Sequence, residues 1–119
     1  ERKKLIMLDH EKLDVYQRSV EFFALAVRVI EKIPKGNSVL KDQFNRASLS
    51  ILLNIAEGTG KTSKKDKQRF YAIARGSAME CGAILDACKI LGLIKEPVHD
   101  EGKNLLTRIV SMLTKMCRF

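Results

Sequence analysis

The sequence lacks long apolar runs, cysteine pairs and strand-like alternation, and each absence excludes a class of protein. Its apolar stretches, such as FFALAV and ILL, fall far short of the roughly 18 residues that a membrane span needs, and no signal-peptide pattern opens the chain. Cys81, Cys88 and Cys117 are odd in number and form no Cys-x-x-Cys pair, which favours reduced thiols in a core. We therefore expect a cytoplasmic protein with no membrane contact.

Residue patterns typical of catalysis and metal binding are also missing. The two histidines, His10 and His99, lack the Glu-x-x-His spacing of a di-metal bundle, and no Ser/His/Asp or Cys/His set is evident. Glu57 and Glu80 form a pair of carboxylates that invites an acid/base or metal interpretation. We expect no metal, no cofactor and no enzymatic activity.

The stretch GTGKTS, residues 58–63, looks at first like the end of a phosphate-binding loop. That signature requires a glycine five positions before the glycine of Gly-Lys-Thr, and Ile55 stands there instead. The usual context is also a buried strand, whereas the lead-in SLSILLNIAEG has a helical pattern. The stretch is better read as the end of one helix followed by the start of another.

Apolar spacing predicts four helices. The first covers residues 13–33 and ends before Pro34, the second begins at Asn37 or Ser38, the third opens at Ser63 and ends at Gly92, and the fourth begins near Pro97. For the first helix the predicted inward stripe is Leu13, Tyr16, Val20, Phe23, Val27 and Ile30, widened by a second stripe of Val15, Phe22, Ala26, Val29 and Ile33. The predicted core row of the second helix is Leu40, Phe44, Ala47, Ile51 and Ile55. That of the third helix is Phe70, Ile73, Ala74, Ser77, Cys81, Ile84, Cys88 and Leu91. That of the fourth helix is Leu105, Leu106, Ile109, Met112, Leu113 and Met116.

Four helices with short connections pack most simply as an all-α, antiparallel up-down-up-down four-helix bundle. We expect the bundle to cover residues 13–119, preceded by a short basic extension at residues 1–12 that contains Arg2, Lys3 and Lys4. The second helix is apolar around much of its circumference, which predicts burial on more than one side. We expect a second copy of the chain to cover its outer leucines, Leu49, Leu52 and Leu53.

Positive charge is concentrated in two segments. Residues 60–75 carry six cations against one acid, and residues 102–119 carry four cations and no acid, whereas the whole chain has a net charge of +8. In an antiparallel bundle the start of the third helix lies beside the end of the fourth, so the two segments should meet at one end. The predicted nucleic-acid-binding residues are Lys61, Lys64, Lys65, Lys67, Arg69, Arg108, Lys115 and Arg118. Because Tyr71 and Phe119 are the only nearby aromatic candidates, we expect contacts to the backbone rather than to bases.

Polar residues flank the core rows of the second and third helices. In a bundle such positions are partly buried, where a charge requires a partner. We predict a structural polar network at this junction, formed by Arg46, Asn54, Glu57, Ser77 and Glu80. Glu57, in a last helical turn, should have a compensating partner: Arg46, the start of the next helix, or another basic residue.

The segment QFNRASLSILLNIAEGTGKTSKKDKQRFYAIARGSAMECGAILD resembles the four-helix-bundle proteins encoded by intervening sequences of bacterial 23S ribosomal RNA genes. The matching elements include Asn54-Ile55-Ala56-Glu57-Gly58, Arg69-Phe70 and Gly76-Ser77, and LDVYQRSVEFFALAVRVIEKIPK resembles the first helix of the family. That group is similar in fold to the accessory variability determinant proteins of diversity-generating retroelements. The resemblance implies a homopentameric barrel with a basic surface and, in the retroelement branch, a non-enzymatic accessory that binds a reverse transcriptase and nucleic acid.

Three functional hypotheses follow. The first is a non-catalytic, homo-oligomeric accessory protein that binds the backbone of RNA or DNA, in a reverse-transcriptase or ribosomal RNA-associated complex. The second is an interaction scaffold whose basic surface binds an acidic protein partner without nucleic acid. The third is an enzyme that uses Glu57 or Glu80.

Overall fold

The computed structural model describes residues 7–118, so the basic residues Arg2, Lys3 and Lys4 and the aromatic Phe119 lie outside the described part. Residues 7–118 contain four α-helices, two short 3-10 helices and no strand. The α-helices are α1 (Asp14–Lys32), α2 (Ser38–Thr59), α3 (Lys64–Ile90) and α4 (Glu96–Met116), and the 3-10 helices are η1 (Asp9–Lys12) and η2 (Lys35–Asn37). The prediction of an all-α protein with four helices is confirmed.

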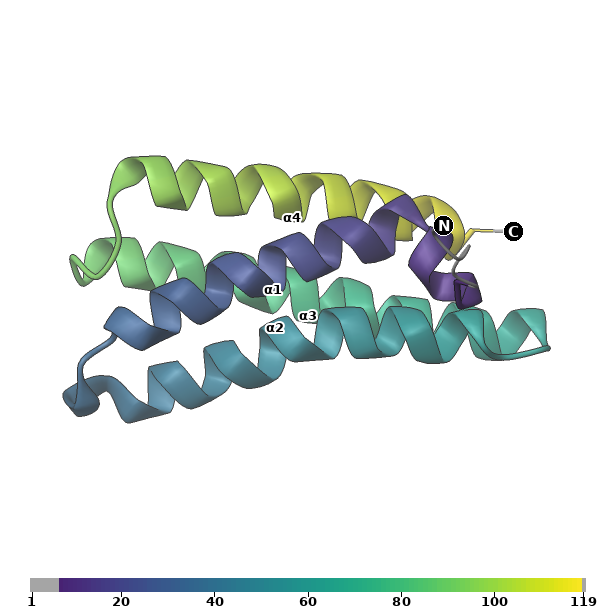
Figure 1. Ribbon diagram of the computed structural model, residues 1–119, viewed down its shortest axis with the longest axis horizontal. Helices are drawn as coiled ribbons and strands as arrows, with labels where there is room; N and C mark the ends of the chain where they lie inside the picture. The colour runs from purple at the N-terminus through teal and green to yellow at the C-terminus, as the bar shows by residue number, and fades with distance from the viewer. Residues whose placement is uncertain (1–6, 119) are drawn as a thin grey trace, which may run out of the picture.

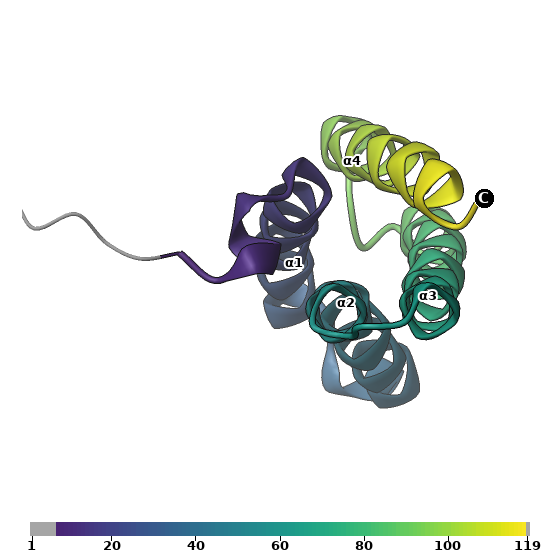
Figure 2. The same ribbon diagram turned by 90° about the vertical axis from the view of Figure 1, so that its right-hand side faces the viewer.

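The helices form a ring in which each one contacts two others. α1 packs on α2, α2 on α3, α3 on α4, and α4 on α1 (Figure 2). Directions alternate along the chain in Figure 1, where α1 and α3 run leftward and α2 and α4 run rightward. This arrangement fits the predicted up-down-up-down order. It places the α2–α3 turn and the last turn of α4 at the same end of the bundle (Figure 1).

The helix boundaries follow local sequence signals. Ser63 precedes α3, and its Oγ accepts a hydrogen bond of 3.1 Å from the backbone N–H of Asp66, as its resemblance to a capping box predicts. Gly92, just beyond α3, has a φ of +73°, a left-handed conformation that glycine adopts without strain. Pro97 lies in the first turn of α4, where its missing N–H costs no helical hydrogen bond.

The core row of α1 differs from the predicted one. Val20 and Val27, both in the predicted inward stripe, are 42% and 38% exposed, whereas Phe22 and Ala26 of the second stripe are fully buried. The buried row also includes a polar residue, Ser19, whose hydroxyl donates to the carbonyl of Tyr16 at 2.6 Å. Because that hydrogen bond satisfies the hydroxyl, Ser19 can occupy the core, and the row looks less apolar in the sequence than it is in space.

The predicted row of α2 is correct except that Leu40 is half-buried, and α4 keeps Leu105, Leu106, Ile109 and Leu113 in the core. α3 requires a correction. Ile73 and Leu91 are exposed, and the core instead receives Tyr71, Ala78 and Leu85. Across the bundle, the rings of Phe22 and Phe44 have centroids 6.2 Å apart in a tilted arrangement.

Candidate nucleic-acid interface

The end of the bundle formed by the α2–α3 turn and the last turn of α4 carries most of the predicted nucleic-acid-binding residues, and we call it the basic end. Two side-chain contacts join its segments, which are far apart in the sequence. Gln68 Nε2 donates to the carbonyl of Cys117 at 3.1 Å, and Arg75 Nε donates to Thr114 Oγ1 at 2.8 Å. The structure therefore brings the two basic segments together, as the topology predicts.

Lys61, Lys67 and Arg108, which belong to the predicted set, each contact a carbonyl or an acid within the chain. Lys67 Nζ donates to the carbonyl of Thr59 at 2.9 Å, which satisfies an otherwise unpaired group at the C-terminus of α2. Lys61 Nζ lies 2.9 Å from Glu57 Oε2, and Arg108 Nη2 lies 3.9 Å from Asp14 Oδ2. The Lys67 contact helps to end α2, whereas the ion pairs of Lys61 and Arg108 are exposed and stabilise the fold only weakly.

Four other cations of the set project from the basic end. Lys65, Arg69, Lys115 and Arg118 are exposed, and within residues 7–118 none of their side chains forms an ion pair or a hydrogen bond. Lys64, the first residue of α3, is exposed as well. The exposed charge is therefore contributed by both the first turns of α3 and the last residues of the described chain.

Towards the other end of the bundle, several cations of α3 and α4 are paired with acids. Lys89 Nζ lies 2.7 Å from Glu96 Oε1, and Asp86 Oδ1 lies 2.9 Å from Lys103 Nζ and 2.8 Å from His99 Nε2. The pKa of Asp86 is lowered, first by the hydrogen bond with His99 and then by that with Lys103. These pairs tie α3 to α4, and the contrast with the basic end makes the charge asymmetry a property of the folded chain.

Phe70 is a partly exposed aromatic residue at the basic end, although sequence reasoning assigned it to the core row of α3. The Cζ atom of Arg69 lies 4.6 Å from the centroid of the Phe70 ring, and Lys61 Nζ lies 5.2 Å from it. Tyr71, the predicted aromatic candidate, is only 6% exposed, and its hydroxyl lies 3.0 Å from Thr59 Oγ1. Two nearby cations could have identified Phe70 as a surface aromatic residue of the basic end. Arg69 is adjacent to it in sequence, and Lys61 lies across the turn.

A polar contact joins α2 to α3 but contains only two of the five predicted network residues. Ser50 Oγ lies 2.8 Å from Ser77 Oγ, and Asn54 Nδ2 donates to Ser50 Oγ at 2.9 Å. The network therefore consists of Ser50, Asn54 and Ser77, all half-buried. Asn54 and Ser77 belong to the predicted set, and the spacing of four between Ser50 and Asn54 places them on one face of α2.

The structure corrects the placement of the three charged members of that set. Arg46, Glu57 and Glu80 are exposed in the single chain. On α2, Arg46 and Glu57 are eleven residues apart and lie together on the side of the helix nearly opposite the core row. The compensating partner of Glu57 is Lys61, one turn further on, and an exposed pair of this kind contributes only about 0.3–0.5 kcal/mol.

The cysteines are free thiols, with Cys81 and Cys88 buried and Cys117 half-buried. Burial, and secondarily the charge of Glu80, raises the pKa of the Cys81 thiol to about 12. Cys81 is therefore protonated at neutral pH and packs as a small apolar side chain, because only the thiolate is a strong nucleophile or metal ligand. Within residues 7–118, no group of three or more His, Cys, Asp or Glu side chains could hold a metal ion.

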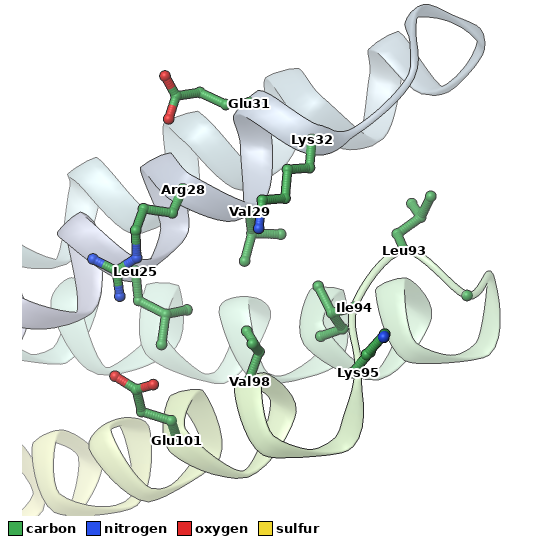
Figure 3. A pocket seen from close by; sticks show the side chains of 11 residues that line it. Leu25, Arg28, Val29, Glu31, Lys32, Leu93, Ile94, Lys95, Val98 and Glu101 are labelled. Atoms are coloured by element: carbon green, nitrogen blue, oxygen red, sulfur yellow. The ribbon is translucent and has the colours of Figure 1, made fainter.

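A cavity of about 660 Å³ lies at the end opposite the basic end (Figure 3). Leu25, Val29 and Val98 form its apolar part together with the α3–α4 loop, and Arg28 and Glu101 stand at its rim (Figure 3). Because the rim carries both signs of charge, it does not favour a polyanion. The bundle thus has a cluster of exposed cations at one end and an apolar cavity with a rim of mixed charge at the other.

The fold and the basic end together define a class, that of four-helix all-α proteins with a strongly positive end. The family model of the 23S rRNA-intervening sequence protein matches residues 11–115, so the chain belongs to that family. A similar solved structure is the 1.70 Å crystal structure of a protein of unknown function of the S23 ribosomal protein family from Bacteroides thetaiotaomicron VPI-5482. The two chains are 23% identical, the match covers 88% of this chain and 99% of the other, and the TM-score is 0.82. At that identity the likeness concerns the fold alone.

No curated protein matches this chain. Within residues 7–118, every helix falls short of the length and apolar character needed to cross a membrane.

Proposed function

We propose that this protein is a non-catalytic, homo-oligomeric accessory protein that binds the phosphate backbone of RNA or DNA at its basic end, with little sequence specificity. The observation that carries the proposal is the meeting of two basic segments at one end, where Lys65, Lys115 and Arg118 are exposed and have no acidic partner within the described chain. Such a surface suits a polyanion, because each neutralised phosphate releases condensed counterions.

The cellular setting is part of the same proposal. We place the function in the cytoplasm, where Cys81, Cys88 and Cys117 would stay as thiols. A ribosomal RNA-associated complex fits the family. A reverse transcriptase, which the sequence resemblance implies for the retroelement branch, is a proposed protein partner. Copurification followed by sequencing of the bound nucleic acid would identify the cognate molecule.

The binding test compares two charge-reversal variants with the same net charge. In the first, Lys65→Glu, Lys115→Glu and Arg118→Glu act at the basic end. We expect this variant to bind about tenfold more weakly to every sequence tested, and the slope of log K against log salt to flatten by about 2–3, because up to three phosphate contacts are lost. Fluorescence anisotropy of a labelled oligonucleotide at several salt concentrations measures both quantities.

The matched control reverses three exposed lysines at the opposite end, with Lys32→Glu, Lys35→Glu and Lys95→Glu. This control changes the net charge equally and should largely retain the affinity and the salt slope of the unmodified chain. Equal weakening by both variants would show that only the net charge matters and would contradict a basic-end site.

The competing function is a scaffold that binds an acidic protein partner through the same surface. It is distinguished by affinity purification carried out with and without nuclease. Nucleic-acid binding predicts that associated material is lost after nuclease treatment, whereas an acidic protein partner would remain.

Self-association is supported by an apolar face on the α1–α2 hairpin. Val20 and Val27 of α1 and Leu53 of α2 are exposed, while Leu49 and Leu52 are half-buried. By helical geometry, the α1 residues lie on the side turned away from Leu25, which faces α4 in Figure 3. Leu49 and Leu53 lie on the side of α2 turned away from Phe44, which is fully buried in the core, and Leu52 lies next to that side. Both sides therefore belong to the outer surface of this hairpin, and we propose that a second copy covers it, with a pentamer as the expected assembly.

The assembly test introduces a charge into this face with Leu53→Glu. We expect the unmodified chain to elute as a multiple of its 13.5 kDa mass, and the variant to shift towards the monomer with unchanged helix content. Size exclusion with light scattering measures the mass, and circular dichroism measures the helix content. Ile90→Glu is the control, because Ile90 is 85% exposed at the far end of α3 and should not affect assembly. A monomeric unmodified chain at micromolar concentration would refute the proposed interface.

A further inference from the structure

The Phe70 ring at the basic end is accompanied by two cations. Arg69 Cζ lies 4.6 Å and Lys61 Nζ lies 5.2 Å from the ring centroid, both within the roughly 6 Å of a cation–π contact. Phe70 itself is half-buried, so part of its side chain reaches the surface. An aromatic side chain in a basic groove is the combination that proteins use to bind single-stranded nucleic acid.

The guanidinium of Arg69 has hydrogen-bond donors that no contact within the described chain uses. Arg69 is exposed, and within residues 7–118 its guanidinium forms no hydrogen bond and no ion pair. A guanidinium is planar, carries five N–H donors and stacks on flat rings, including nucleobases. Its position over Phe70 restricts the guanidinium without occupying its donors. Lys61, in contrast, is held by its ion pair with Glu57.

We infer that Arg69 and Phe70 form a stacking subsite for an unpaired base of single-stranded RNA or DNA, beside the lysines that contact phosphates. This inference rests on the proposed function and narrows its ligand from any nucleic acid to strands with unstacked bases. A duplex hides the faces of its bases and offers this subsite only its backbone. The expectation of pure backbone contact from the sequence would then be incomplete, since it left Phe70 out of account.

Phe70 also has a structural role, so the test must separate stacking on a base from packing on α2. A Cβ atom placed on Gly58 would lie 3.1 Å from Phe70 Cβ, which shows how closely the base of this side chain packs on α2. That packing involves Phe70 and leaves Arg69 free to change. Arg69→Lys keeps the charge and removes the planar group, so its effect on the preference for base-bearing over abasic strands reports on stacking.

The experiment measures affinity by fluorescence anisotropy for matched 12-nucleotide probes. These are a single-stranded oligothymidine, a strand of equal length with abasic sites, the corresponding duplex, and a single-stranded oligouridine to compare RNA with DNA. The first two carry the same number of phosphates, so they differ in the bases alone. We expect the unmodified chain to bind the base-bearing strand on the order of tenfold more tightly than the abasic strand. In Arg69→Lys this ratio should fall towards one, because affinity for the base-bearing strand falls more than affinity for the abasic strand.

Phe70→Leu is the second variant and should also reduce the ratio, with circular dichroism confirming that it folds. Equal, salt-dependent binding of the base-bearing and abasic strands by the unmodified chain would overturn the stacking subsite and leave the proposed function intact. A full base preference retained by Arg69→Lys would also overturn it. Absence of binding to every probe at low salt would instead refute the proposed function itself.

Discussion

Replacing Phe22 with alanine is expected to lower the free energy of unfolding by about 3–5 kcal/mol. Phe22 is fully buried, and its ring packs against that of Phe44 with a centroid distance of 6.2 Å. Truncation removes the transfer free energy of the ring and leaves a cavity that the close-packed helices fill only in part. Urea denaturation followed by circular dichroism, at a fixed protein concentration, measures the change.

Phe23→Ala is the matched control, since it makes the same chemical change one residue further along α1. Phe23 is half-buried and belongs to the stripe that the heptad-like spacing favoured. We expect its effect on the isolated subunit to be less than half that of Phe22→Ala. If Phe23 lies between subunits, its effect should increase with protein concentration, because assembly is then linked to folding. An equal loss for both variants at concentrations where the chain is monomeric would contradict the assignment of the core row.

This pair of residues also shows how far the sequence determines the fold. The number of helices, their order and their ends follow from apolar periodicity, Ser63, Gly92 and the two prolines. The rotation of α1 about its own axis does not follow from the sequence, because two neighbouring stripes of this helix are both apolar. Ser19 occupies the core only by donating a hydrogen bond to its own helix, which periodicity does not reveal. When a helix has a second apolar stripe, sequence alone does not decide which stripe faces the core.

The sequence likewise predicts some features of the candidate site and not others. Convergence of the basic segments follows from topology, which the connection lengths and helix order already predict. The partners of individual cations do not follow, because they depend on side-chain geometry at the α2–α3 turn. Lys67 caps α2 through the carbonyl of Thr59, and Lys61 pairs with Glu57, although both count equally with Lys65 in a sum of charges. The same local geometry places Arg69 over Phe70 and makes this ring part of the surface chemistry.

Replacing Gly58 with valine is expected to lower the free energy of unfolding by about 3 kcal/mol, at the upper end of the cost of overpacking a core. Gly58 lies in the last turn of α2, where an added Cβ would come within 2.9 Å of Tyr71 Cε1 and 3.1 Å of Phe70 Cβ. Tyr71 has little freedom to move, because it is buried and its hydroxyl contacts Thr59 Oγ1. The glycine is therefore required by the close approach of α3, and no phosphate loop is needed to explain it.

Gly76→Val provides the control within α3. Gly76 is exposed, and an added Cβ would have no neighbour within 4 Å, so we expect a change of at most about 0.5 kcal/mol. Thermal and urea unfolding of both variants measure the difference. The Gly58 variant should also weaken oligonucleotide binding, because the start of α3 must shift and it carries Lys64, Lys65 and Arg69. If Gly58→Val is as stable as Gly76→Val, α3 can move away from α2 at little cost, and the packing that positions the basic end is looser than the geometry indicates.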